Sequence, residues 1–144
     1  MNIKLTKMVY IASPYSSKLK SKRQRILQQE ERFNSITRII GELHDIFDYA
    51  FIGPITQSHL TVKHRKKPDT GFKMWAKIDF TYISRCDELW VVMLPGWKES
   101  HGVKEETLFC RRNKIEVKFL NPKTLQLFDE DPFNEIEAVF NNCS

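Results

Sequence analysis

The sequence has no long hydrophobic run. No apolar stretch approaches the roughly 20 residues that a membrane-spanning helix needs. The amino-terminal segment also lacks the continuous apolar core of a signal peptide, because its short apolar run alternates with polar residues. Hydrophobic residues make up 41% and charged residues 28% of the chain, as in an ordinary globular protein. We therefore expect a soluble, cytoplasmic protein with no membrane partner.

Cysteines are few and are poorly placed for cross-links or metal binding. Cys86, Cys110 and Cys143 are odd in number, lie far apart and include no CxxC pair. This spacing argues against a disulfide framework and a zinc knuckle, so we expect free thiols. His44 and His59 have no second ligand at metal spacing. We expect neither a metal nor an organic cofactor.

Acidic residues are fewer than basic ones, 18 against 23, which gives a formal net charge of +5. Much of the excess lies in two clusters, residues 18–25 and 63–67. Such clusters can bind nucleic acid. However, no aromatic residues interleave with the basic ones, as a groove for single strands requires. We therefore favour a solvated face, or loops that attract small anions, over nucleic-acid binding.

The chain has the length of one domain, covering residues 1–144, and contains no internal repeat or low-complexity segment. Short apolar runs without clean polar alternation are typical of strands buried on both faces. Because these runs alternate with helical patterns, the sequence predicts an α/β, doubly wound, flavodoxin- or Rossmann-like fold. Its mainly parallel sheet should have four or five strands, with helices on both faces. The expected strands are 8–13, 50–55, 88–94 and 115–120, and the expected helices are 22–46, 72–86, 101–113 and 131–141, with a polar loop over 56–71.

Three predicted loops follow the strands at their carboxyl ends. They cover residues 13–17, 53–59 and 95–102. Open α/β sheets bind their ligands beyond the carboxyl ends of the strands. These loops are therefore where we expect the functional residues.

An aspartate interrupts the apolar face of the helix predicted over 72–86. Asp79 lies three residues after Ala76 and three before Tyr82, within one stripe of the helix. A carboxylate there is costly unless it is paired, hydrogen-bonded or at the edge of a site. Asp79 is therefore either the partner of a buried arginine or a functional group.

The next predicted helix repeats this pattern. Glu106 falls on its less polar face with Val103 and Cys110, whereas Glu105 points toward solvent. An ordinary ion pair is the more frequent role of a helical glutamate. Two inward carboxylates at one edge of a sheet can instead divide the roles of nucleophile and acid/base between them.

The start of the same helix offers groups that can hold an anion. Ser100 supplies a hydroxyl, and the segment up to Gly102 supplies unpaired backbone N–H groups, the arrangement that binds phosphate at a helix N-terminus. The alternative is that Ser100 is a plain N-cap, which is compatible with phosphate binding.

Aromatic residues accompany the predicted loops. Tyr10, Tyr15 and Ser16 occupy the first strand and its exit loop, where an aromatic face can stack on a base. The alternative for Tyr10 is that it fills the core. Trp97 lies in the loop after the third strand, but tryptophan more often packs than contacts a ligand.

Five segments together resemble the nucleoside 2-deoxyribosyltransferase superfamily, and most closely its small phage and bacterial homologues. Their order and spacing carry the resemblance, which spans most of the chain. The segments are 10–16, 54–59, Trp75 with Asp79, 86–91, and 94–97 with Ser100, Gly102, Val103 and Glu106.

The resemblance implies roles for the two carboxylates. Glu106 would attack the anomeric carbon of a nucleoside, and Asp79 would assist. The transferases usually carry an aspartate six residues before the nucleophile, where this chain has Ser100. The segment from Ser100 to Glu106 instead resembles the Ser-x-Gly-Val-x-x-Glu motif of nucleoside 5′-monophosphate N-glycosidases, in which the serine and adjacent backbone hold the 5′-phosphate.

The implied activity is cleavage of the N-glycosidic bond of a nucleoside 5′-monophosphate, or deoxyribosyl transfer between bases. Relatives assemble so that neighbouring subunits complete each site, which implies a homo-oligomer. The alternatives are a protein that sequesters a nucleotide without turnover, and an enzyme that cleaves the same bond in NAD. The expected substrate-binding residues are Tyr10, Ser13, Tyr15, Ser16, Arg32, His59, Trp97, Ser100 and Gly102.

Overall fold

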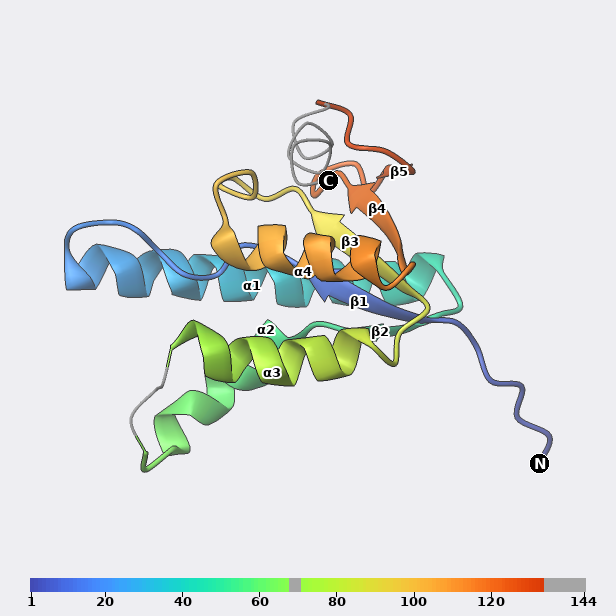
Figure 1. The fold of residues 1–144 in the computed structure, drawn as a ribbon, viewed down its shortest axis with the longest axis horizontal. Coiled ribbons are helices and arrows are strands. Elements are labelled where there is room, and N and C mark those ends of the chain that lie inside the picture. Colours follow the sequence, from blue (N-terminus) through green and yellow to red (C-terminus); the bar gives the residue numbers. More distant parts are fainter. Residues whose placement is uncertain (68–70, 134–144) are drawn as a thin grey trace.

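The computed structural model describes residues 1–67 and 71–133. In this part of the chain one sheet has the strand order β2-β1-β3-β4-β5 (Figure 1). Neighbouring strands pair in parallel except β5, which is antiparallel to β4. The strands are β1 (Met8–Ala12), β2 (Ala50–Ile52), β3 (Glu88–Val92), β4 (Glu116–Leu120) and β5 (Leu127–Phe128). The helices are α1 (Lys22–Ile46), α2 (Pro54–Thr61), the 3₁₀ turn η1 (Val62–His64), α3 (Phe72–Ile83) and α4 (His101–Arg112).

The two faces of the sheet carry separate hydrophobic clusters. On β1, Val9 and Ile11 pack with residues of α1, whereas Tyr10 and Ala12 pack with residues of α3 and α4, because successive side chains of a strand point to opposite faces. The helices accordingly cover both faces (Figure 1). The predicted doubly wound, mainly parallel α/β sheet is confirmed. The α1 side includes Ile36, Ile39, Leu43, Trp90 and Val92, and the α3 and α4 side includes Ile83, Val103, Cys110, Val91 and Phe119.

Local sequence explains where the two best-predicted helices begin. The Ser21 hydroxyl caps α1 by accepting a hydrogen bond from the Gln24 N–H at 3.4 Å. The Ser100 hydroxyl caps α4 in the same way, accepting from the Val103 N–H at 3.3 Å. Each cap satisfies one N–H group that has no partner within the first helical turn.

The structure differs from the sequence prediction after β2. The loop predicted over 56–71 is wrong for residues 56–64, because α2 and η1 occupy them, and α2 begins at Pro54, at a first-turn position that suits proline. No residue of α2 is fully buried, so the helix has no apolar stripe that a pattern could reveal. β5 was not predicted, and it has only two residues. The helix predicted over 131–141 lies, apart from its first three residues, outside the described part of the chain.

Cys86 and Cys110 are buried and free, as expected, and Cys143 lies outside the described residues. None of the helices in the described segments is both long enough and apolar enough to cross a membrane.

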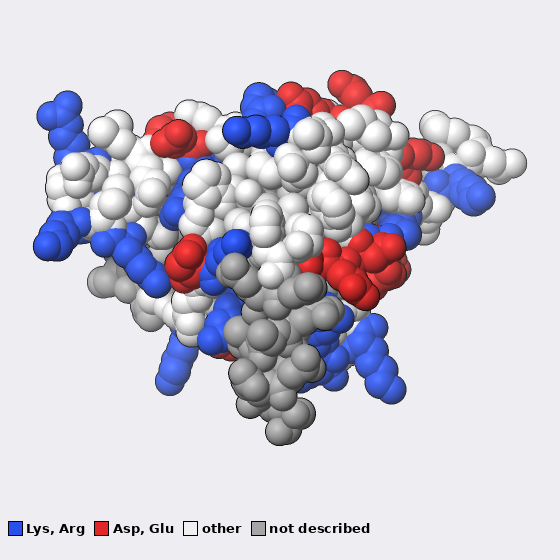
Figure 2. All heavy atoms as spheres, turned by 90° about the horizontal axis from the view of Figure 1, so that it is seen from above, with Lys and Arg blue, Asp and Glu red and all other residues white. Residues whose placement is uncertain are grey.

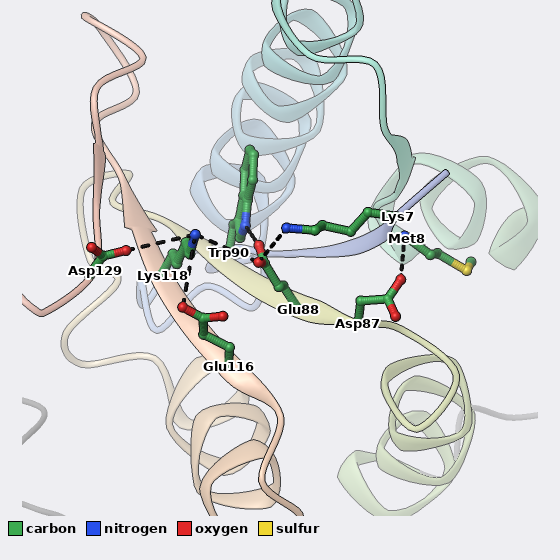
Figure 3. Close-up of polar contacts among 8 residues, drawn as sticks. All are labelled: Lys7, Met8, Asp87, Glu88, Trp90, Glu116, Lys118 and Asp129. Atoms are coloured by element: carbon green, nitrogen blue, oxygen red, sulfur yellow. Dashed lines mark hydrogen bonds and ion pairs between the residues drawn. The ribbon is translucent and has the colours of Figure 1, made fainter. Parts of the chain in front are cut away.

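A buried glutamate joins three strands at the amino end of the sheet (Figure 3). Glu88 Oε1 accepts a hydrogen bond from Lys7 Nζ at 2.8 Å, and Oε2 accepts one from Trp90 Nε1 at 2.7 Å. Lys118 Nζ of β4 lies 3.6 Å from Oε1. Burial raises the pKa of Glu88, but the bonds from Lys7 and Trp90 and the Lys118 charge outweigh it and hold the pKa below its ordinary value. Glu88 is therefore an ionised, partnered carboxylate that ties β3 to Lys7, just before β1, and to Lys118 of β4.

Replacing Glu88 by Gln should lower the free energy of unfolding at pH 7 by on the order of 2 kcal/mol, because two lysines lose a charged partner. Since the folded pKa is lowered, the contribution of Glu88 is present above the unfolded pKa and is lost as the pH falls through the folded pKa. Urea denaturation should therefore show a larger cost of the substitution at pH 7 than at pH 3.

The matched control is Glu42→Gln, which breaks the exposed Arg38–Glu42 pair at 2.9 Å. It should change the free energy of unfolding by less than about 0.5 kcal/mol. Equal costs for the two substitutions would contradict the role given to Glu88.

Candidate active site

A cavity of about 530 Å³ lies at the carboxyl end of the sheet. Its walls come from the end of β1 and the loop after it, from α1 and α2, from α3, and from the amino-terminal half of α4. This is the edge at which parallel α/β sheets hold their ligands. The predicted residues that line the cavity are Tyr10, Ser13, Tyr15, Ser16, Asp79, Ser100, Gly102 and Glu106.

Glu106 lies in the apolar layer between α4 and the sheet, with its residue only 8% exposed. Burial raises the pKa of its carboxyl to about 8, and the nearby Asp79 charge acts in the same direction. A hydrogen bond with the Tyr10 hydroxyl opposes the shift but does not cancel it. Burial among apolar residues also raises the pKa of Tyr10, so its phenol keeps its proton and donates to Glu106.

Asp79 faces the same cavity from α3. Burial raises the pKa of its carboxyl to about 6. The two carboxyl groups interact, so their titration belongs to the pair rather than to either residue alone. Between about pH 6 and pH 8 the pair holds roughly one proton, which is the state that acid/base chemistry with two carboxylates requires.

The start of α4 adds groups suited to an anion. A Cβ atom added to Gly102 would lie 3.9 Å from both Glu106 Oε1 and Ser100 Oγ, so these two oxygen atoms face one region. The first N–H groups of a helix have no partner within it and carry partial positive charge. Across the cavity, the Ser13 hydroxyl is buried and has no hydrogen-bond partner among the described residues. A buried hydroxyl of this kind is available to a ligand.

Arg32 is outside the residues that line the cavity, although it was expected to bind substrate. Its guanidinium donates hydrogen bonds to the Ser16 carbonyl at 2.7 Å and to the carbonyls of Tyr15 and Pro95 at 3.3 Å. Gly96 has a φ of 92°, and a Cβ added there would lie 2.7 Å from Arg32 Nη2. Arg32 therefore joins the loop after β1 to the loop after β3.

His59 and Trp97 are also outside the cavity lining. His59 Nδ1 lies 2.6 Å from the Tyr15 hydroxyl, so His59 reaches the cavity only through Tyr15. Trp97 is 5% exposed and packs in the core, with its ring centroid 5.9 Å from that of Phe119. In this structure Trp97 is therefore a core packing residue, as in the alternative considered for it.

Four further polar residues line the cavity that the sequence did not single out. Ser58 belongs to a segment that resembles the transferase superfamily, and His101 lies between the predicted residues Ser100 and Gly102. The sequence around both residues therefore pointed to the site. Lys18 belongs to a basic cluster, whereas Gln29 had no signal because it lies on the long helix α1. The four are Lys18, Gln29, Ser58 and His101.

Several lysine and arginine side chains lie at this end of the molecule. Figure 2 shows lysine and arginine side chains gathered at the left end, where α1 begins in Figure 1. The lysines of residues 18–25 are exposed there, and Lys18 itself lines the cavity. A basic rim raises the local concentration of anions. Within the described residues, no group of three or more His, Cys, Asp and Glu side chains could hold a metal ion.

These features define an α/β domain with a paired-carboxylate cavity at the carboxyl edge of its sheet. Residues 7–121 match the model of the DUF1937 family, a domain of unknown function, and the chain belongs to that family. No curated protein matches the chain. It is similar to the crystal structure of a conserved protein from Enterococcus faecalis V583, with a TM-score of 0.54 and 16% identity over 95% of this chain and 75% of that chain. At this identity the likeness shows the fold alone.

The free energy of unfolding should fall as the pH rises from about 5 to 8. Asp79 and Glu106 have raised folded pKa values, so their contribution is fully present below the unfolded values and is lost as the pH rises through about 6 and 8. The slope should approach about 1.4 kcal/mol per pH unit for each proton involved. Urea denaturation at several pH values measures it.

Glu106→Gln should flatten this dependence, because the amide does not titrate. Glu105→Gln, on the next residue of α4, should leave the slope unchanged. A slope in Glu106→Gln as steep as that of the unaltered protein would contradict the burial effect on Glu106.

Proposed function

We propose that this protein cleaves the N-glycosidic bond of a nucleoside 5′-monophosphate, with Glu106 as the nucleophile and Asp79 as the acid/base partner. The observation that carries the proposal is the pair of interacting carboxyl groups in one cavity, the buried Glu106 and the partly buried Asp79, next to the start of α4. Such a pair divides nucleophile and acid/base roles in glycoside chemistry.

The proposed reaction has two steps. The Glu106 carboxylate attacks C1′, a glycosyl ester forms, and the C–N bond breaks with its electron pair passing to the base. Because Glu106 has the higher pKa, the single proton of the pair first passes from Glu106 to Asp79, and Asp79 then delivers it to the departing base. A water molecule then attacks C1′ of the ester and gives a proton to Asp79, which releases Glu106 as carboxylate. In the transfer variant of this reaction, a second base replaces the water.

Tyr10 has a defined part in this scheme. Its hydroxyl donates to the Glu106 carboxyl, and this hydrogen bond lowers the pKa of that group against the effect of burial. Tyr10 therefore increases the fraction of Glu106 that is ionised. The residue is 2% exposed, and its ring packs in the core between β1 and the covering helices.

The phosphate would lie at the start of α4. Ser100, the N–H groups up to Gly102 and the unpartnered Ser13 hydroxyl offer donors on the walls of the same cavity. Lys18 in the cavity wall and the basic side chains near it favour a phosphorylated substrate over a free nucleoside. The resemblance of the segment from Ser100 to Glu106 to nucleoside 5′-monophosphate N-glycosidases supports the same placement. We extend to this chain the assembly of that superfamily as a homo-oligomer.

The direct test is incubation with nucleosides, their 5′-monophosphates and NAD, scored for free base by chromatography. Glu106→Gln should lower turnover by at least ~10³-fold, because loss of a nucleophile removes several kcal/mol of transition-state stabilisation. Glu105→Gln should retain most of the activity. Full activity of folded Glu106→Gln, or binding of nucleotides with no release of base by the unaltered protein, would remove the catalytic proposal.

Ser100→Ala should lower the preference for monophosphates over nucleosides by about tenfold, measured as the ratio of their kcat/KM values. The matched control is Ser21→Ala, which removes the N-cap of α1 away from the cavity and should leave that ratio unchanged. Both substitutions should cost about 1 kcal/mol of stability through loss of a cap. An unchanged ratio in Ser100→Ala would show that the phosphate lies elsewhere.

A further inference from the structure

Three polar side chains form a chain that ends at the cavity. The Tyr15 hydroxyl lies 2.6 Å from His59 Nδ1, and His59 Nε2 lies 2.8 Å from Glu30 Oε2. Tyr15 lines the cavity, whereas Glu30 is exposed on α1 and His59 is held on α2 between them. The chain therefore connects two helices to the side chain of a residue that lines the cavity.

The His59 ring is fixed in orientation as well as in position. Phe33 stacks on it with ring centroids 4.2 Å apart and an interplanar angle of 17°. Tyr15 meets it edge-on, at 5.7 Å and 87°. Only 15% of the His59 side chain is exposed. Stacking and a hydrogen bond at each nitrogen hold the His59 ring in one orientation. Nδ1 therefore faces Tyr15 and Nε2 faces Glu30.

The direction of each hydrogen bond follows from Glu30. A carboxylate only accepts, so His59 Nε2 carries the hydrogen that faces it. In the neutral ring Nδ1 is then the acceptor, and the hydroxyl of Tyr15 donates to it. Burial and the Glu30 charge raise the pKa of Tyr15, so the hydroxyl retains the proton that it donates.

The consequence for the cavity is chemical selectivity. A phenol has one proton, and that of Tyr15 is already donated to His59. The oxygen atom can offer a ligand only its remaining lone pairs. A phosphate oxygen placed there would meet lone pair against lone pair, whereas a hydroxyl or amine of the ligand would complete a hydrogen bond.

We propose that Tyr15 is a specificity-determining residue, set by the positioning residues His59 and Glu30 to accept a hydrogen bond from a hydroxyl or amine group of the ligand. The inference rests on the proposed function only for the choice of nucleotides as ligands. The proposal gives two parts of the cavity wall different roles. The start of α4 donates hydrogen bonds to an anion, and Tyr15 accepts one from a hydroxyl or amine.

The first test needs no ligand. Nitrogen-15 NMR of the histidine side chains at pH 8 should show His59 as the Nε2–H tautomer. Glu30→Leu should weaken this preference, whereas the matched control Glu31→Leu, on the next exposed residue of α1, should not. An Nδ1–H tautomer of His59 in the unaltered protein would overturn the proposal.

The second test measures binding by calorimetry at pH 8 in a Glu106→Gln background, so that bound nucleotide is not consumed. Comparison of CMP with its 2′-deoxy and 3′-deoxy forms tests whether a sugar hydroxyl is the donor. Comparison of CMP with UMP, and of GMP with IMP, tests whether an amine of the base is the donor. The donor-bearing ligand should bind about tenfold more tightly in one of these comparisons.

Tyr15→Phe and His59→Phe should reduce that preference to less than threefold, with unchanged circular dichroism. Glu30→Gln should retain it, because the amide oxygen still accepts from Nε2–H, and His44→Phe, at an exposed histidine of α1, serves as the control. No preference in any comparison, or one that survives in Tyr15→Phe, would overturn the inference. Selective binding without base release by the unaltered protein would leave the inference standing and remove the proposed reaction. Failure to bind any of these probes would overturn both.

Discussion

The parallel pairing of β1 with β3 is the constraint on which both ends of the molecule depend. Its register, from Val9 opposite Glu88 to Ala12 opposite Val91, places the starts of both strands at one edge and their ends at the other. At the starting edge, Glu88 comes within reach of Lys7 and Lys118. At the other edge, the loop after β1 meets the first turn of α4, and the cavity lies between them. The pairing of β1 with β3 therefore places the ion cluster of Glu88 at one end of the strands and the cavity at the other end.

The two buried glutamates show how partners decide the state of a carboxyl group. Glu88 and Glu106 are 4% and 8% exposed, so burial disfavours the charge of both. Two lysines and an indole N–H surround Glu88, and they keep its pKa below the ordinary value. Glu106 has a phenol and a second carboxyl instead, and its pKa rises to about 8. A low pKa is typical of a carboxylate that holds a structure together, and a raised one of a group that exchanges protons.

The sequence predicted those parts of the fold that leave a periodic trace. α1 matches its predicted bounds because Ile36, Ile39 and Leu43 recur at helical spacing on a capped segment. Asp79 and Glu106 stood out because each carboxylate interrupts an apolar face, and both line the cavity. α2 left no such trace because it buries no residue fully. The contacts of His59 could not be predicted either, because 44 positions separate it from Tyr15 and 29 from Glu30, and no local rule pairs them.

Arg32 has a consequence for the energetics of binding. One guanidinium holds carbonyl groups of the loops after β1 and β3, so neither loop can shift without breaking a hydrogen bond to the same side chain. Both loops are thus ordered before a ligand arrives, and their conformational entropy has been lost during folding rather than during association. A ligand that enters between them meets a preorganised surface. The free energy of its contacts then contributes to affinity instead of offsetting the ordering of the walls.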